Sequence, residues 1–172
     1  MARGMRPNRP PRVEGFPYRG YRRYFVTLTT DFRARVFALD THAGTLAVQI
    51  SPFFAARSFE VLAYCVMPDH LHLLLEGVSD EADLLEAVRA WKQRTGYDWK
   101  ARTGARLWQP GFHDRVLREG DDTRSVVRYI LLNPVRAGLA NAPCDYRWLG
   151  SLRYSLRELE QHAGQWVPEW KR

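Results

Sequence analysis

The sequence predicts an α+β fold, in which an antiparallel sheet carries helices on one of its faces. Two observations support this prediction. Runs rich in β-branched and aromatic residues alternate with stretches of helical periodicity, and the break at residues 67–69 is short enough for a hairpin turn. At 172 residues the chain has the size of one domain. The element order β-α-β-β-α-β-α then predicts a ferredoxin-like or RRM-like arrangement.

Each expected element follows from a local pattern. Thr41 is expected to cap the first helix, and Pro52 is expected to kink or restart it. Pro134 is expected to stop or bend the last helix, which Asp122 or Thr123 would cap, and Gly138 is a natural end. The expected bounds are 24–29 (strand), 41–54 (helix), 59–66 and 70–75 (strands), 82–99 (helix), 112–118 (strand) and 122–133 (helix).

The chain is basic. Lys and Arg number 26 and Asp and Glu number 19, which gives a formal charge of +7. This balance favours a polyanionic partner, with nucleic acid first and an anionic membrane surface second, although a merely soluble basic protein has the same composition. Arginines recur among prolines and glycines in residues 1–23, which we expect to form a flexible basic arm or a solvated tail.

Several other classes of protein are not supported. Cys65 and Cys144 form no Cys-x-x-Cys pair, so nothing indicates a zinc ribbon or a redox motif, and the cysteine usage fits a reducing cytosol. The N-terminus lacks the apolar segment of a secretory signal, and no apolar run has the length of a membrane span. We therefore expect a cytoplasmic protein without a membrane partner.

Two histidines follow the expected hairpin turn. His70 and His72 are two residues apart in an apolar strand, so their side chains point to the same face. Two imidazoles on one face of a strand form half of a divalent metal site. A single histidine on a strand is usually structural, but two buried imidazoles without partners would be costly.

The last expected helix carries a phenol and an amide on one face, because Tyr129 and Asn133 are four residues apart. The amide oxygen of Asn133 suits Mg²⁺ or Mn²⁺ as a third ligand beside the histidines. Tyr129 would then lie beside the metal, where a phenol attacking a phosphodiester leaves a phosphotyrosyl intermediate. The alternatives are a packing tyrosine and an asparagine that caps the helix before Pro134.

Cations distributed along the chain are candidates for phosphate contacts, and an ordinary solvated surface is the alternative for each. We expect DNA contacts from Arg22, Arg23, Arg89, Lys92, Arg115, Arg118 and Arg136. The tail, residues 141–172, interleaves aromatic residues with arginines. We expect Trp148 to cover the sheet, whereas Trp166 and Trp170 could either cover it or stack on unpaired bases.

Four segments together resemble the single-tyrosine HUH transposases, in which a His-hydrophobic-His motif binds the metal, and most closely their REP-associated tyrosine transposase branch. The segments are 24–29, 66–72 with His70-Leu71-His72, 108–118 from Trp108-Gln109-Pro110-Gly111, and 129–139 with Tyr129-x-x-x-Asn133-Pro134-Val135-Arg136-Ala137-Gly138. His-x-His alone is a weak signal, but the combination is specific and spans about residues 21–155. After Trp148 the chain departs from the serine-rich, aromatic run that the family often has there.

The resemblance implies a single-stranded DNA transposase with an HUH nuclease fold. His70, His72 and Asn133 would bind Mg²⁺ or Mn²⁺, and Tyr129 would form a 5′-phosphotyrosine beside hairpins of repetitive palindromic elements. It further implies a catalytic domain at 24–140, followed by a C-terminal tail at 141–172, and a monomer or homodimer. The basic arm at 1–23 is longer than a minimal domain of the family needs. A hairpin-binding module without turnover and a metal-dependent hydrolase that uses water remain as alternatives.

Overall fold

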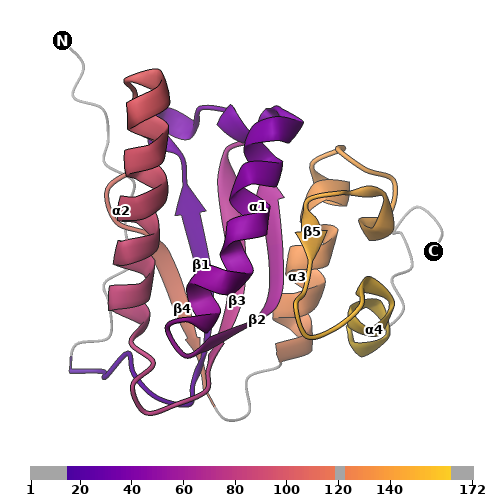
Figure 1. Cartoon of the computed structure of the whole chain (residues 1–172). Coiled ribbons are helices and arrows are strands. Elements are labelled where there is room, and N and C mark those ends of the chain that lie inside the picture. The colour runs from indigo at the N-terminus through magenta and orange to yellow at the C-terminus, as the bar shows by residue number, and fades with distance from the viewer. Residues whose placement is uncertain (1–14, 119–122, 164–172) are drawn as a thin grey trace.

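The computed structural model describes residues 15–118 and 123–163 and has one sheet with helices around it (Figure 1). The strands are β1 (Arg23–Thr29), β2 (Phe59–Met67), β3 (His70–Gly77), β4 (His113–Leu117) and β5 (Leu149–Gly150). The helices are α1 (Asp40–Ala55), α2 (Leu84–Thr103), α3 (Thr123–Arg136) and α4 (Leu156–His162). No helix among the described residues combines the length and apolarity that crossing a membrane requires.

The sheet has the strand order β4-β1-β3-β2-β5, and every neighbouring pair is antiparallel. The predicted α+β class and antiparallel sheet are therefore confirmed. The expected hairpin is also present, because Met67 pairs with His70 and leaves Pro68 and Asp69 as the turn. The short strand β5 and the helix α4 lie in the tail and were not expected from the sequence.

The prediction that helices cover one face only is wrong. α1 and α2 pack on one face of the sheet, and α3 packs on the other, where Ile130 and Leu131 meet Leu74 (Figure 1). The reason lies in the central strand β3, in which the consecutive residues Leu73, Leu74 and Leu75 are all fully buried. Consecutive residues of a strand face opposite sides, so an unbroken apolar run needs a cover on both faces.

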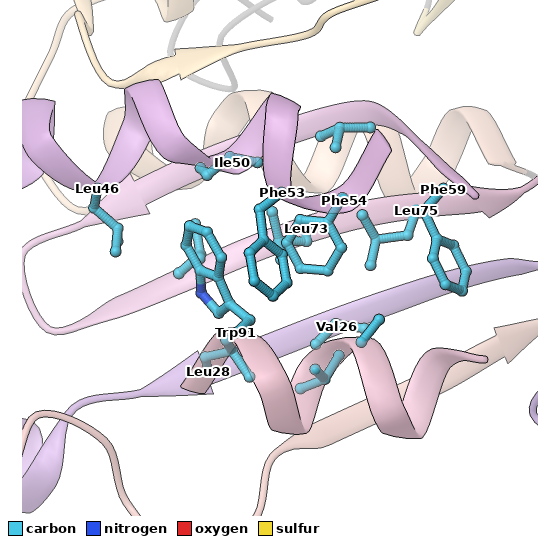
Figure 2. Packing of buried hydrophobic residues seen from close by; sticks show 14 of the residues in the cluster. Val26, Leu28, Leu46, Ile50, Phe53, Phe54, Phe59, Leu73, Leu75 and Trp91 are labelled. Carbon is cyan, nitrogen blue, oxygen red and sulfur yellow. The ribbon is translucent and has the colours of Figure 1, made fainter. Parts of the chain in front are cut away.

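The larger core lies between the sheet and the pair α1 and α2, as Figure 2 shows. Trp91 of α2 contacts Phe53 and Phe54 of α1 at ring-centroid distances of 5.0 and 5.4 Å. Val26 and Leu28 of β1 point into the same layer and are fully buried (Figure 2). The packing of Val26 and Leu28 fixes which face of β1 points toward α1 and α2. The residues that alternate with them therefore point to the opposite face, which carries the site described below.

Neither Pro52 nor Pro134 ends its helix, so the expected restart and the expected stop are both wrong. α1 continues through Pro52 to Ala55, and α3 continues through Pro134 to Arg136. Each proline lies in the last turn, where it removes a hydrogen bond near the helix end. Thr41 is not a cap, because α1 already begins at Asp40, whereas Gly138 has φ +67° just after α3, as its expected role as a helix end requires.

Parts of the expected arm and tail pack on the domain. Tyr18 is buried, and its carbonyl accepts a hydrogen bond from the amide of Leu84 at the start of α2. In the tail, Trp148 donates to Asp40 at 2.8 Å and lies against Gly44 of α1. Residues 1–14 of the arm, the turn 119–122 with the candidate cap Asp122, and Trp166 and Trp170 lie outside the described residues.

Candidate active site

The register of the central strands places both histidines on the face that α3 covers. His72 pairs with Thr27 across β1 and β3, and His70 pairs with Thr29. His72 is almost fully buried and His70 is half-buried. Leu71 and Leu73 alternate with the histidines along β3 and point to the opposite face of the sheet, where they are part of the core. Their packing therefore holds β3 in the register that presents the imidazoles to α3.

The two imidazoles point their Nε2 atoms at each other, 3.0 Å apart. Nδ1 of His70 lies 2.6 Å from Oδ1 of Asp69, and Nδ1 of His72 lies 2.9 Å from Oγ1 of Thr27. A carboxylate only accepts, so the His70 ring carries its proton on Nδ1 and leaves a lone pair on Nε2. Arg33 lies 3.3 Å from the other carboxylate oxygen of Asp69.

Thr27 serves both tautomers of His72, because a hydroxyl donates as well as accepts. When Nε2–H of His72 donates to His70, the Thr27 hydroxyl donates to Nδ1. If both Nε2 atoms held a cation, Nδ1–H of His72 would donate to Thr27 instead. Burial first, and the neighbouring His70 second, lower the pKa of His72 to about 3, so the ring is neutral and able to ligate near pH 7.

The helix α3 brings the phenol and the amide to the same place. The Tyr129 ring is 5.5 Å from the His72 ring and 5.6 Å from the Phe25 ring, with 42% of the residue exposed. Asn133 forms a side-chain hydrogen bond with His72 that raises the pKa of the imidazole, which indicates that the amide oxygen accepts from the ring. The guanidinium carbon of Arg136 lies 5.8 Å from the Tyr129 ring centroid.

These residues fit a divalent cation. Two nitrogens bound at about 2.1 Å and about 90° apart on one ion are separated by about 3.0 Å, which matches the Nε2–Nε2 distance. Both imidazoles have partners on Nδ1 that orient the rings, as metal-bound histidines usually do. Among the described residues no group of three or more His, Cys, Asp or Glu could hold a metal, and the amide oxygen of Asn133, which hydrogen-bonds to His72, is the candidate for a third protein ligand.

An open pocket of about 480 Å³ lies beside Tyr129, between β4 and α3. Phe25 and Tyr129 form apolar walls, and His113, Arg115 and Ser125 provide polar groups. Arg115 pairs in register with Phe25, so it faces the site. The pocket therefore gives a nucleotide-sized entry to the phenol from solvent.

The seven candidate DNA contacts divide by position. Arg115 and Arg136 lie on the face of the site, and both are exposed. Arg22 stacks over Phe16, and Arg23 forms an ion pair with Glu76 at 2.7 Å, at the far end of β1.

Lys92 has a structural contact that the sequence did not indicate, because its ammonium donates to the carbonyls of Gln109 and Gly111. Arg89 on α2 and Arg118 after β4 are exposed. A role of each of the seven in DNA binding stays a prediction.

Sequence reasoning missed three residues that build the site: Thr27 and Asp69, which orient the histidines, and Phe25, which contacts both His72 and Tyr129. Asp69 could have been found, because it precedes His70 in the turn. Thr27 and Phe25 depend on the pairing of β1 with β3, which no local pattern specifies.

Comparisons with known proteins agree with this geometry. The family model described as "Transposase IS200 like" matches residues 21–132. A REP-associated tyrosine transposase of Escherichia coli (strain K12) is 28% identical over 132 residues, which cover 73% of this chain and 78% of that protein. A Haemophilus influenzae protein provisionally given the same description is 28% identical over 136 residues, covering 72% and 76%.

Solved structures show the same fold. The structure of a REP-associated tyrosine transposase bound to a REP hairpin superposes with a TM-score of 0.70 at 21% identity and covers 93% of both chains. A structure described as a transposase from Deinococcus radiodurans covers 72% of this chain and 97% of its own at a TM-score of 0.50 and 23% identity. The family model spans more than half of the residues, and the chain therefore belongs to the IS200-like transposase family.

Proposed function

We propose that this chain is a metal-dependent single-stranded DNA transposase that cleaves and rejoins DNA beside hairpins through a 5′-phosphotyrosine on Tyr129. The observation that carries the proposal is the position of one partly exposed phenol 5.5 Å from the ring of His72, whose Nε2 faces that of His70. Family membership supports DNA strand transfer, and the relative bound to a REP hairpin supports a hairpin as the recognised element.

The residues divide the chemistry between them. The Tyr129 oxygen forms a bond to phosphorus while the bond to the 3′ oxygen breaks, and the phenol proton balances the 3′-hydroxyl that is released. The number of phosphoester bonds does not change, so a later attack by a 3′-hydroxyl reverses the step and rejoins strands. Mg²⁺ or Mn²⁺ held by His70, His72 and Asn133 would polarise the phosphoryl oxygen. Arg136, beside the Tyr129 ring, would contact the phosphate.

The test uses a labelled single-stranded DNA hairpin with flanking sequence, incubated with the protein and Mg²⁺ or Mn²⁺ and separated on a denaturing gel. The proposal expects a covalent adduct that Tyr129→Phe abolishes. Tyr154→Phe, a substitution at another exposed tyrosine, is the matched control and should retain the adduct.

The other outcomes separate the alternatives. Cleavage that survives Tyr129→Phe would indicate a hydrolase that uses water, and hairpin binding without cleavage would indicate a binding module without turnover. Tyr129 lies beside His72 of the same chain, so a monomer has a complete set of residues. A homodimer is the alternative state, which analytical ultracentrifugation with and without DNA distinguishes.

A further inference from the structure

A second surface, on the other side of the sheet from Tyr129, is unexplained by the chemistry above. An open groove of about 880 Å³, here called the α2 groove, lies between the exposed side of α2 and the loop 104–110. Its lining includes Tyr97 and Lys100 of α2, Arg106 and Gln109 of the loop, and Asp31. It lies on the α2 side of the sheet, whereas Tyr129 lies on the α3 side.

Several hydrogen bonds hold the walls of the α2 groove. The amide of Asp31 donates to the carbonyl of Leu107 at 2.7 Å, and Arg106 forms an ion pair with Asp31 at 2.8 Å. The loop is anchored from below by Trp108, which is buried and donates to Thr95 of α2 at 2.8 Å. Lys92 binds two loop carbonyls. The groove is therefore formed before any ligand enters it.

Two aromatic side chains at this surface face solvent. Tyr97 is 75% exposed and lines the groove, and Phe32, next to Asp31, is 89% exposed. Phe32 and Arg33 have φ values of +51° and +54°, a left-handed conformation that is strained for residues other than glycine. The turn is held in place by Thr30, which donates from its hydroxyl to the carbonyls of Ala34 and Asp69. Strain that the surroundings maintain is typical of functional segments.

The same turn links the α2 groove to the metal-binding residues. Arg33 contacts Asp69 at 3.3 Å, and Asp69 contacts His70 at 2.6 Å. Arg33 and Arg106 are both ion-paired, yet their side chains stay 69% and 58% exposed, so each keeps N–H donors toward solvent. The charged residues that line the α2 groove are Lys92, Lys100, Arg106 and Asp31, so the lining is net positive.

We propose that the α2 groove binds the single-stranded DNA that flanks the hairpin, after the strand passes over the turn at Phe32 and Arg33. Tyr97 and Phe32 stack on unpaired bases, and Lys100 and Arg106 contact phosphates. Exposed aromatics interleaved with cations are the combination that holds unpaired strands, whereas a duplex stem offers no free base faces. The inference rests on the proposed function only in placing the DNA at His70 and His72.

The test measures equilibrium binding in EDTA, where no cleavage occurs. Fluorescence anisotropy compares a bare hairpin with hairpins that carry a 5′ or a 3′ single-stranded extension of ten nucleotides. Tyr97→Ala and Phe32→Ala should each weaken binding of at least one extended hairpin by about tenfold, with the bare hairpin changed less than about twofold. Val48→Ala, at an exposed residue of α1, should leave all three affinities unchanged.

A second readout concerns charge. Lys100→Gln should reduce the salt dependence of extended-hairpin binding, by about 0.7 in the slope of log K against log salt, and not that of the bare hairpin. The inference would be overturned if the substitutions weakened binding of bare and extended hairpins equally, or weakened binding of neither extended hairpin. It would also be overturned if two copies of the protein associated through this surface and Phe32→Ala abolished that association. Absence of a covalent adduct in the cleavage assay would count against the proposed function alone, because this assay needs no turnover.

Discussion

Replacing Thr27 by valine tests whether the hydroxyl that pairs with Nδ1 of His72 controls the proposed metal binding. The substitution removes the hydroxyl 2.9 Å from Nδ1 and keeps the shape of the side chain. His72 is 3% exposed, so no water replaces the lost partner. Leaving a buried polar group unpaired costs about 1–3 kcal/mol, and we expect the free energy of unfolding without metal to fall by about that amount.

The effect on metal affinity follows from the two tautomers. Loss of an outer partner of a ligating histidine typically weakens metal binding by about 10- to 100-fold. The Thr27 hydroxyl pairs with His72 both with and without a cation, so its removal destabilises both states and the two effects partly cancel. We therefore expect the metal affinity to fall by about tenfold, the lower end of this range. Thr27→Ser keeps the hydroxyl and should restore most of the affinity.

Electron paramagnetic resonance titration with Mn²⁺ measures the affinity, and urea unfolding in EDTA measures stability. Thr45→Val is the control, because the Thr45 hydroxyl donates only to its own helix, at the carbonyl of Thr41. If Thr27→Val binds Mn²⁺ as tightly as the unaltered protein, the orientation of the His72 ring does not depend on this hydroxyl, and the reasoning is refuted.

Three further predictions concern catalysis, binding and stability. His70→Ala and His72→Ala should abolish adduct formation and largely spare hairpin affinity; an equal loss of affinity in a filter-binding assay would argue against a purely catalytic role. Hairpin binding should weaken steeply with salt, with a slope of log K against log salt of about −3 or steeper, and a flat titration would contradict phosphate contacts. Asp83→Asn should lower the free energy of unfolding by about 0.5 kcal/mol at pH 7, because the carboxylate caps α2 and pairs with Arg19. Burial raises the pKa of Asp83, but the hydrogen bond from the Glu86 amide and the contact with Arg19 outweigh it, so the pKa in the folded protein is below 3.8. The stability difference between the unaltered protein and Asp83→Asn is therefore present above about pH 4 and disappears as the pH falls through the folded pKa. Urea unfolding at several pH values measures this difference.

Local patterns sufficed for much of the fold and for naming the four candidate site residues that the structure brings together. Period-two alternation and a proline-containing turn located the hairpin that carries His70 and His72, and four-residue spacing placed Tyr129 and Asn133 on one face of α3. The side of the sheet on which α3 packs was not predictable in the same way. Leu71, Leu73 and Leu75 mark one face of β3 as buried, but the other face combines His70, His72 and Glu76 with Leu74, so its pattern does not show whether a helix covers it.

Other features depended on contacts between distant segments. β5 is two residues long and exists because Leu149 and Gly150 pair with β2, which no propensity of a dipeptide predicts. Lys92 resembled a surface cation in the sequence, yet it binds carbonyls of a loop about twenty residues later. Both cases involve backbone partners whose position is set by the rest of the fold.

The active site and the core share one strand. In β1, Val26 and Leu28 fill the layer under α1 and α2, while Phe25 and Thr27, which alternate with them along the strand, face the histidines. A shift of β1 by one residue would bury Thr27 in that layer and turn Val26 toward His72, and the apolar packing opposes such a shift. The hydrophobic core on the opposite face therefore maintains the strand register that brings Thr27 to His72, and the Thr27 hydroxyl then orients the ring. Core substitutions that loosen β1 should consequently impair metal binding before they unfold the protein.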